Sequence, residues 1–194
     1  MRIFIFIIIL IFIFSIYTIL KLEKHEVKYV PSQVDGKEYL VRDLPDKQEA
    51  ANLLAEVKKN IMLLVNNLYD NRNTTYKDHK DDIEQLKRRI ANVIINESTG
   101  DSAYTSYSVN KGEQIVFCLR SKHTNRLHNL NLIMYVALHE MAHVGCKSYG
   151  HTDEFKKIFA FYTNTAIKLG LYSKIHFNEE PVEYCGLMIS ESII

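Results

Sequence analysis

Three histidines and one glutamate in the second half of the sequence have the spacing of a metal site. His139, Glu140 and His143 form the pattern H-E-x-x-H inside a run of apolar residues. Two helical residues that are four apart lie on one face, so both imidazoles can reach one metal ion. Glu140 is turned about 100° from His139, so it can lie beside the ion and act on water instead of binding the metal.

A further histidine follows where the chain has to turn back. Gly150 and His151 come between two predicted helices, at residues 130–146 and 152–169, and the turn can present His151 to the same ion. Three histidine ligands leave a fourth position open for water, which is typical of catalytic zinc. We therefore predict that the three histidines bind Zn²⁺ and that Glu140 is the catalytic base. The alternative is that the histidines are ordinary core residues or helix caps.

The elements that must hold this site are predicted from hydrophobic periodicity. Apolar residues recur at spacings of three and four in residues 46–69 and 81–96, which predicts two more helices. Asp46, with a Glu three positions later, fits a capping box at the start of the first helix. Residues 109–120 are the best strand candidate, because a β-prone run follows an Asn-Lys-Gly turn. The predicted class is a small α+β domain over residues 46–194, mainly helical with a short β-sheet.

The beginning of the sequence differs in character from the rest. Residues 3–20 are apolar and carry no charge, and 18 helical residues span about 27 Å, close to the roughly 30 Å hydrocarbon core of a bilayer. The small-residue pattern of a signal-peptide cleavage site is not present after them. These features predict a retained N-terminal transmembrane helix over residues 1–20, a single-pass membrane location and a polar linker at residues 21–45. The side of the membrane on which the domain lies stays open.

The metal motif also carries a family resemblance. The segment HEMAHVGCKSYGHTDEF resembles the HExxH…GHxxxF signature of the WLM and SprT-like minimal zincin metallopeptidases, and it is most similar to the WLM-like proteins of large DNA viruses. The resemblance covers residues 100–190. It implies a small zincin-like fold, zinc held by His139, His143 and His151, Glu140 as the catalytic base, and a protein or peptide substrate. The metzincins do not fit, because their third histidine comes six positions after the second and the interval here is eight.

The charge balance limits the partners of the predicted domain. Outside residues 1–20, in which Arg2 is the charged residue, 23 Lys and Arg stand against 23 Asp and Glu. A net charge of zero provides no basic field for nucleic acid, and the basic run at residues 87–89 fits a solvated helix face. The sequence predicts a membrane-anchored zinc-dependent metalloendopeptidase. The alternatives are a non-catalytic, zinc-stabilised binding module tethered to the membrane and, against the charge balance, a DNA–protein-crosslink protease of the SprT/WLM type. The oligomeric state stays open.

Two further residue types could bear on the chemistry. Peptide hydrolysis produces an oxyanion that needs a donor besides the metal, and three tyrosines are candidates for it, although each also fits simple packing: Tyr149, Tyr162 and Tyr184. The cysteines are odd in number, so at least one thiol is unpaired within the chain, and each is interpreted as a buried thiol: Cys118, Cys146 and Cys185. Residues 171–194 are expected to be irregular or short-stranded.

Overall fold

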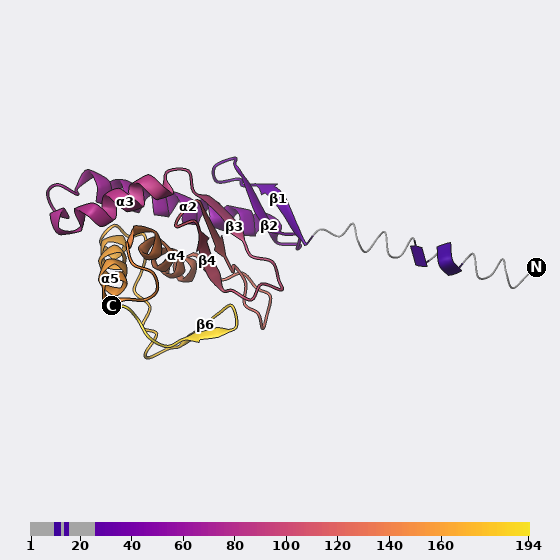
Figure 1. The fold of residues 1–194 in the computed structure, drawn as a ribbon. Helices are drawn as coiled ribbons and strands as arrows, with labels where there is room; N and C mark the ends of the chain where they lie inside the picture. Colours follow the sequence, from indigo (N-terminus) through magenta and orange to yellow (C-terminus); the bar gives the residue numbers. More distant parts are fainter. Residues whose placement is uncertain (1–9, 13, 16–25) are drawn as a thin grey trace, which may run out of the picture.

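The computed structural model describes residues 10–12, 14–15 and 26–194. The described residues form a small α+β domain in which helices pack against short strands (Figure 1). The elements follow in the order β1 (Val27–Pro31), β2 (Glu38–Arg42), α2 (Lys47–Asp70), η1 (Lys77–His79), α3 (Lys80–Ile90), β3 (Ile94–Glu97), β4 (Ser106–Val109), β5 (Gln114–Phe117), α4 (Leu130–Gly145), α5 (Asp153–Lys168), β6 (Val182–Tyr184) and β7 (Leu187–Ile189).

The predicted transmembrane helix and the single-pass membrane location are wrong on this structure. None of the helices among the described residues is both long and apolar enough to cross a membrane, which takes about 20 apolar residues. Within the predicted span, only residues 10–12 and 14–15 are described as helical. The rest of that span, residues 1–9, 13 and 16–20, lies outside the described residues.

The segment expected to be a polar linker contains a β-hairpin. β1 and β2 pair antiparallel, with Val30 opposite Tyr39. Val30, Tyr39 and Val41 are buried in the core, and the hairpin packs against α2. The alternation of buried and partly exposed residues along β2 is the period-2 pattern of a half-buried strand. The division of the chain into domains stays a prediction.

The core lies between the helices and the three-stranded sheet. In that sheet β5 is central, with β3 parallel to it on one side and β4 antiparallel on the other. α4 contacts α2, α3, α5 and β4, and most of its side chains are buried (Figure 1). A helix that is apolar on nearly all sides belongs in the interior. The polar motif on α4 is therefore positioned by packing from several directions.

Two predicted element boundaries differ in the structure. The helix expected over residues 81–96 ends at Ile90, and residues 94–97 form β3, because the β-branched run Val93-Ile94-Ile95 is better suited to a strand. The strand expected over residues 109–120 is shorter. β4 ends at Val109, and the left-handed backbone at Asn110, Lys111 and Gly112 turns the chain into β5, so the predicted Asn-Lys-Gly turn is confirmed.

The predicted capping box at the start of α2 is also wrong. Asp46 is the N-cap residue, but its side chain makes no capping hydrogen bond. Its carboxylate instead accepts a hydrogen bond from Arg120 Nη1 at 2.6 Å. This charged contact lowers the pKa of Asp46 below its ordinary value. A pairing with a residue 74 positions away cannot be read from the local sequence.

Candidate metal centre

The H-E-x-x-H motif lies on α4, and both ends of this helix are fixed. At the start, the Asn129 side chain accepts a hydrogen bond from Leu132 N at 2.9 Å, as an N-cap does. At the end, Gln85 Nε2 donates to the carbonyl of Gly145 at 2.8 Å, and Arg89 Nη1 donates to the carbonyl of Val144 at 3.0 Å. These contacts satisfy carbonyls that the helix itself leaves free. The last turn of α4, which carries the second histidine of the motif, is thereby held in place.

The turn after α4 brings His151 back to the motif. Gly150 has a φ of 78°, a left-handed conformation that glycine adopts without steric cost. Thr152 then caps α5, with its hydroxyl accepting from Phe155 N at 3.3 Å, and Ser148 Oγ lies 2.8 Å from Thr152 Oγ1. His151 is fixed between these contacts and points toward α4.

The ring nitrogens of the predicted ligands meet at one place. The Nε2 atoms of His139, His143 and His151 form a triangle with sides of 3.1 to 3.2 Å. Tetrahedral zinc with ligands at 2.0–2.1 Å separates pairs of ligand atoms by about 3.3 Å, so the three nitrogens match the donor set of a zinc site. This cluster of three histidines can hold a metal ion.

Two phenylalanines of α5 fix the imidazole rings. Phe155 stacks on His143 with ring centroids 4.2 Å apart and an interplanar angle of 27°, and its edge contacts the ring of His139. Phe159 packs edge-on against His139 at 5.3 Å. The periodicity of α5 predicts both residues as part of its buried stripe, and the structure shows that this stripe faces the histidine rings.

The environment keeps two of the histidines neutral. Burial, together with the nearby imidazoles, lowers the pKa of His139 to about 3 and that of His143 to about 4. A neutral imidazole has a free lone pair on one nitrogen, which is the form that binds a metal. Near neutral pH these rings therefore need no proton release before they bind an ion.

Glu140 lies beside the histidines in an apolar environment. Its side chain is only 5% exposed, and burial raises its pKa to about 7. A carboxyl with a pKa near the ambient pH can both accept and return a proton, as a general base and acid must. Glu140 and the three histidines line one cavity of about 600 Å³.

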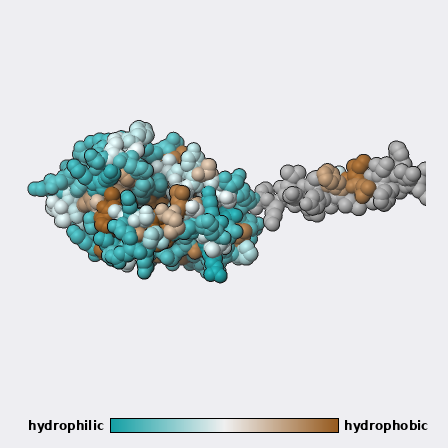
Figure 2. Space-filling model, turned by 90° about the horizontal axis from the view of Figure 1, so that it is seen from below, coloured by the Kyte–Doolittle hydropathy of each residue, from teal (hydrophilic) through white to brown (hydrophobic). Residues whose placement is uncertain are grey.

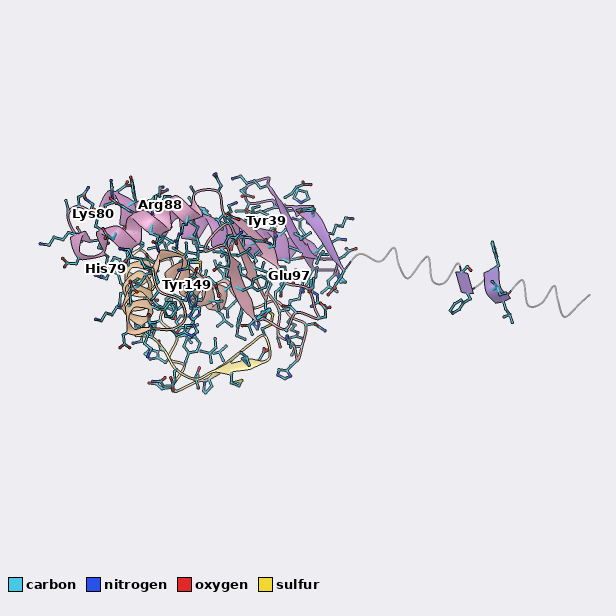
Figure 3. The ribbon with its side chains drawn as sticks, viewed as in Figure 1. Tyr39, His79, Lys80, Arg88, Glu97 and Tyr149 are labelled. Atoms are coloured by element: carbon cyan, nitrogen blue, oxygen red, sulfur yellow. A yellow bond between two sulfur atoms is a disulfide. The ribbon has the colours of Figure 1, made fainter. Side chains whose placement is uncertain are left out.

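The structure distinguishes the three tyrosines. Tyr149, labelled in Figure 3, is 83% exposed, and Lys111 Nζ lies 4.0 Å from the centroid of its ring. Tyr162 is fully buried in the core. Tyr184 of β6 lines the cavity of the histidines, and its hydroxyl lies 2.5 Å from Ser106 Oγ. Burial raises the pKa of Tyr184, so its hydroxyl stays protonated.

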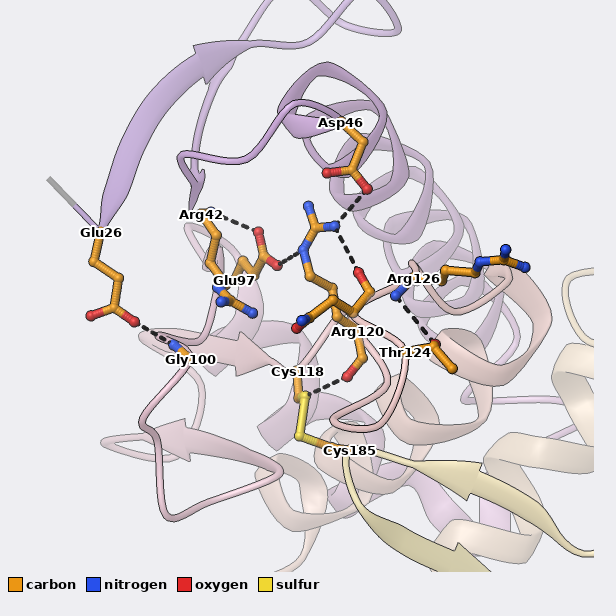
Figure 4. A network of polar contacts seen from close by, with 11 residues as sticks. Glu26, Arg42, Asp46, Glu97, Gly100, Cys118, Arg120, Thr124, Arg126 and Cys185 are labelled. Carbon is orange, nitrogen blue, oxygen red and sulfur yellow. Dashed lines mark hydrogen bonds and ion pairs between the residues drawn. A yellow bond between two sulfur atoms is a disulfide. The ribbon is translucent and has the colours of Figure 1, made fainter. Parts of the chain in front are cut away.

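A disulfide between Cys118 and Cys185 holds the β6–β7 hairpin that carries Tyr184. The two residues are 67 positions apart. The interpretation of both as buried thiols is therefore wrong. The local sequence does not reveal the disulfide, because its two cysteines are far apart along the chain. Cys146 is a free and buried thiol, as predicted. The disulfide ties the end of β5 to the turn between β6 and β7 (Figure 4).

A buried ion-pair network lies next to this disulfide (Figure 4). Arg120, which is 3% exposed, donates from Nε to Glu97 Oε1 at 2.8 Å and from Nη1 to Asp46 at 2.6 Å. Glu97 Oε2 also accepts from Arg42 N at 2.7 Å. Burial raises the pKa of Glu97, although the arginine contacts oppose this shift. The network connects α2, β2 and β3 to the segment after β5.

Comparison with known proteins places the chain among viral sequences. It is 43% identical over 179 residues to uncharacterized protein R325 of Acanthamoeba polyphaga mimivirus, and the alignment covers 92% of this chain and 90% of that protein. The chain belongs to the family of this mimivirus protein. Shorter segments of 67 and 71 residues are 42% identical to uncharacterized protein 042R of Invertebrate iridescent virus 3 and 38% identical to uncharacterized protein 136R of Invertebrate iridescent virus 6. These segments cover 34% and 36% of this chain, and 42% and 39% of the two proteins. The predicted similarity to viral proteins is confirmed.

No family model matches the chain. Two solved structures align with 68% of it at 19% identity: the crystal structure of Wss1 from Saccharomyces cerevisiae, with a TM-score of 0.43 over 90% of that chain, and the crystal structure of a Wss1 mutant, with a TM-score of 0.42 over 92% of that chain. Because the sequence identity and the TM-scores are this low, the more specific resemblance to the WLM and SprT-like metallopeptidases stays a prediction.

Proposed function

We propose that this protein is a zinc-dependent metalloendopeptidase. One observation carries the proposal: three histidine Nε2 atoms lie within 3.2 Å of one another and share a cavity of about 600 Å³ with the buried carboxyl of Glu140. A purely structural zinc site usually has four protein ligands and is closed, whereas three ligands beside an open cavity leave room for water and substrate.

His139, His143 and His151 would hold the ion. When bound, zinc supplies Lewis-acid activation of water and of the substrate carbonyl. The protein supplies the positions of the rings, because Phe155 stacks on His143 and the capped turn at Gly150 fixes His151. A preorganised donor set of this kind does not have to be assembled when substrate binds.

Glu140 would move the proton. Its carboxylate accepts a proton from the attacking water, and the resulting carboxyl donates that proton to the amine nitrogen that leaves when the peptide bond breaks. The raised pKa of about 7 favours this exchange near neutral pH. Tyr184 lies on β6, in the wall of the same cavity, and its hydroxyl contacts Ser106 Oγ and stays protonated. We therefore assign this hydroxyl as the donor to the developing oxyanion.

Cleavage of an unfolded protein by the full-length chain tests this function. The zinc-loaded chain is incubated with reduced, unfolded casein, with and without a chelator, beside Glu140→Gln and the control Glu56→Gln. Glu56 is exposed on α2, outside the set of residues that line the cavity. We expect the chelator and Glu140→Gln to abolish cleavage, and Glu56→Gln to cleave at the rate of the unmodified chain.

Metal analysis of the same samples separates binding from catalysis. We expect one zinc ion per chain in both variants, because neither glutamate is in the proposed ligand set. If zinc binds at this ratio and the unmodified chain cleaves no faster than Glu140→Gln, the metal has a structural role and the enzyme proposal is wrong.

A further inference from the structure

Most of the exposed surface in the cavity beside the histidines is apolar, although Thr105, Ser106 and Ser108 add hydroxyl groups near β4. Tyr135, Val136 and Phe159 line it from α4 and α5, and Leu187 and Ile189 line it from β7. Leu187 is 59% exposed, although it is a large apolar residue. On the face seen in Figure 2, hydrophobic side chains gather around a hollow. An open apolar cavity of this size falls in the range of sites that bind ligands.

The β6–β7 hairpin presents alternate residues of β7 to this cavity. Side chains of a strand point to opposite faces in turn, so Leu187 and Ile189 face the cavity while Met188 faces away. Met188 is 61% exposed, almost the same as its neighbour Leu187, but it is not among the lining residues. The two residues therefore differ mainly in the direction of their side chains.

This wall is fixed in position. The Cys118–Cys185 disulfide ties the turn of the hairpin to the end of β5, and the Tyr184 hydroxyl contacts Ser106 on β4. An apolar surface that is held in place binds a matching side chain without the entropy cost of ordering a loop. The hairpin thus has the properties of a preformed part of a binding site.

We propose that this cavity selects the substrate by taking up one large apolar side chain next to the bond that is cleaved. The proposal rests on the proposed peptidase function and specifies its substrates: polypeptide segments with an accessible leucine, phenylalanine or residue of similar size. The ionisable residues that line the cavity are Glu140, the three histidines and tyrosines. An acidic substrate side chain would lose its hydration among the apolar walls without gaining a cationic partner, which is costly.

Peptide cleavage measures this preference. Quenched-fluorescent peptides share a Gly/Ser/Ala background and differ at one position, which holds Phe, Leu, Ser or Asp, and mass spectrometry locates the cut. We expect cleavage beside Phe and Leu, and at least a tenfold lower kcat/KM for the Ser and Asp peptides. Cleavage of all four peptides at similar rates overturns the proposal but leaves the peptidase function intact.

Binding to a chain that cannot cleave provides the second readout. Fluorescence anisotropy of the labelled peptides is measured with zinc-loaded Glu140→Gln, alone and combined with Leu187→Lys or Met188→Lys. We expect Leu187→Lys to weaken binding of the Phe peptide about tenfold or more, and Met188→Lys to leave it unchanged. Both sites are exposed on the same hairpin, and circular dichroism checks that each variant folds. Equal effects of the two substitutions, or no preference for the Phe peptide, overturn the proposal. If the Phe peptide binds selectively but no chain cleaves it, the peptidase function fails and the apolar binding site stands.

Discussion

Replacing His151 with alanine separates metal binding from folding. His151 is exposed in the turn between α4 and α5, and its ring contacts are the other two imidazoles and the edge of Phe155. Truncation of an exposed side chain away from the core changes stability by no more than about 0.5 kcal/mol. We therefore expect the metal-free variant to unfold at nearly the same temperature as the unmodified chain.

The effect on the zinc-loaded chain is much larger. Zinc at 100 times its Kd stabilises the native state by about 2.7 kcal/mol, which raises the Tm of a domain of this size by roughly 5–11 °C. The structure gives His151 one of three equivalent places in the donor triangle, with Nε2 at 3.1 and 3.2 Å from the other two. Loss of this ligand should weaken zinc binding by about 10- to 100-fold or more. At the same zinc concentration the stabilisation then falls to about 0.4–1.4 kcal/mol, or roughly 1–6 °C.

Thermal unfolding followed by circular dichroism, with zinc or with a chelator, measures both quantities. His123→Ala is the matched control, because His123 is an exposed histidine outside the cluster. We expect the control to retain the full zinc-dependent shift. A full shift in His151→Ala would refute the reasoning and remove His151 from the ligand set.

Further predictions concern the supports of the site. Replacing Cys118 and Cys185 with serine should lower the free energy of unfolding by about 4 kcal/mol, because the disulfide closes a loop of 67 positions and so reduces the entropy of the unfolded chain; urea denaturation measures this change. Thiol titration of the unmodified chain, denatured without reduction, should give one free thiol and not three. Arg120→Met should lower the free energy of unfolding by about 3–5 kcal/mol in the same assay, because it leaves the buried Glu97 carboxylate without its cation. An unchanged urea midpoint would contradict a stabilising role of the ion-pair network. Because His139 and His143 keep depressed pKa values of about 3 and 4 in the metal-free fold, the unfolded state takes up their protons first, and these two groups lower stability as the pH drops from about 6.5 toward 4. The Glu140 carboxyl, with its pKa raised to about 7, takes up its proton first in the folded state and offsets part of this loss, so the profile is measured in Glu140→Gln; a flat profile of that variant between pH 7 and pH 4 would contradict the reasoning.

The parts of the site that local sequence determines were predictable. α4 and α5 follow from periodicity, and the turn between them follows from Gly150 and the first residues of α5. Because a short connection keeps the start of α5 near the end of α4, the approach of His151 to the motif could be inferred without knowledge of the rest of the fold. The burial that raises the pKa of Glu140 was not visible in the sequence, since it depends on how other elements cover α4.

The parts that depend on distant contacts were missed. The sequence predicts a linker where the β1–β2 hairpin lies, because its strands are short and charged, and only its packing on α2 shows which residues are buried. The helix expected to run to residue 96 ends early because β3 finds a parallel partner in β5, a pairing between segments 20 positions apart. The β-branched residues of β3 favour a strand, but a strand of four residues is stable only when it pairs with such a partner.

The two kinds of contact have different consequences for function. The three histidines lie on α4 and in the turn after it, and the contacts that hold them come from α3, α5 and that turn. The opposite wall of the cavity is carried by the β6–β7 hairpin, which is attached to the sheet through the disulfide and through the contact between Tyr184 and Ser106. Because these supports are separate, the hairpin can change in sequence without disturbing the donor triangle. The proposed metal site is thus the part that the local spacing of the histidines predicts, whereas the β7 side of the proposed substrate site depends on contacts between segments that are distant in the sequence.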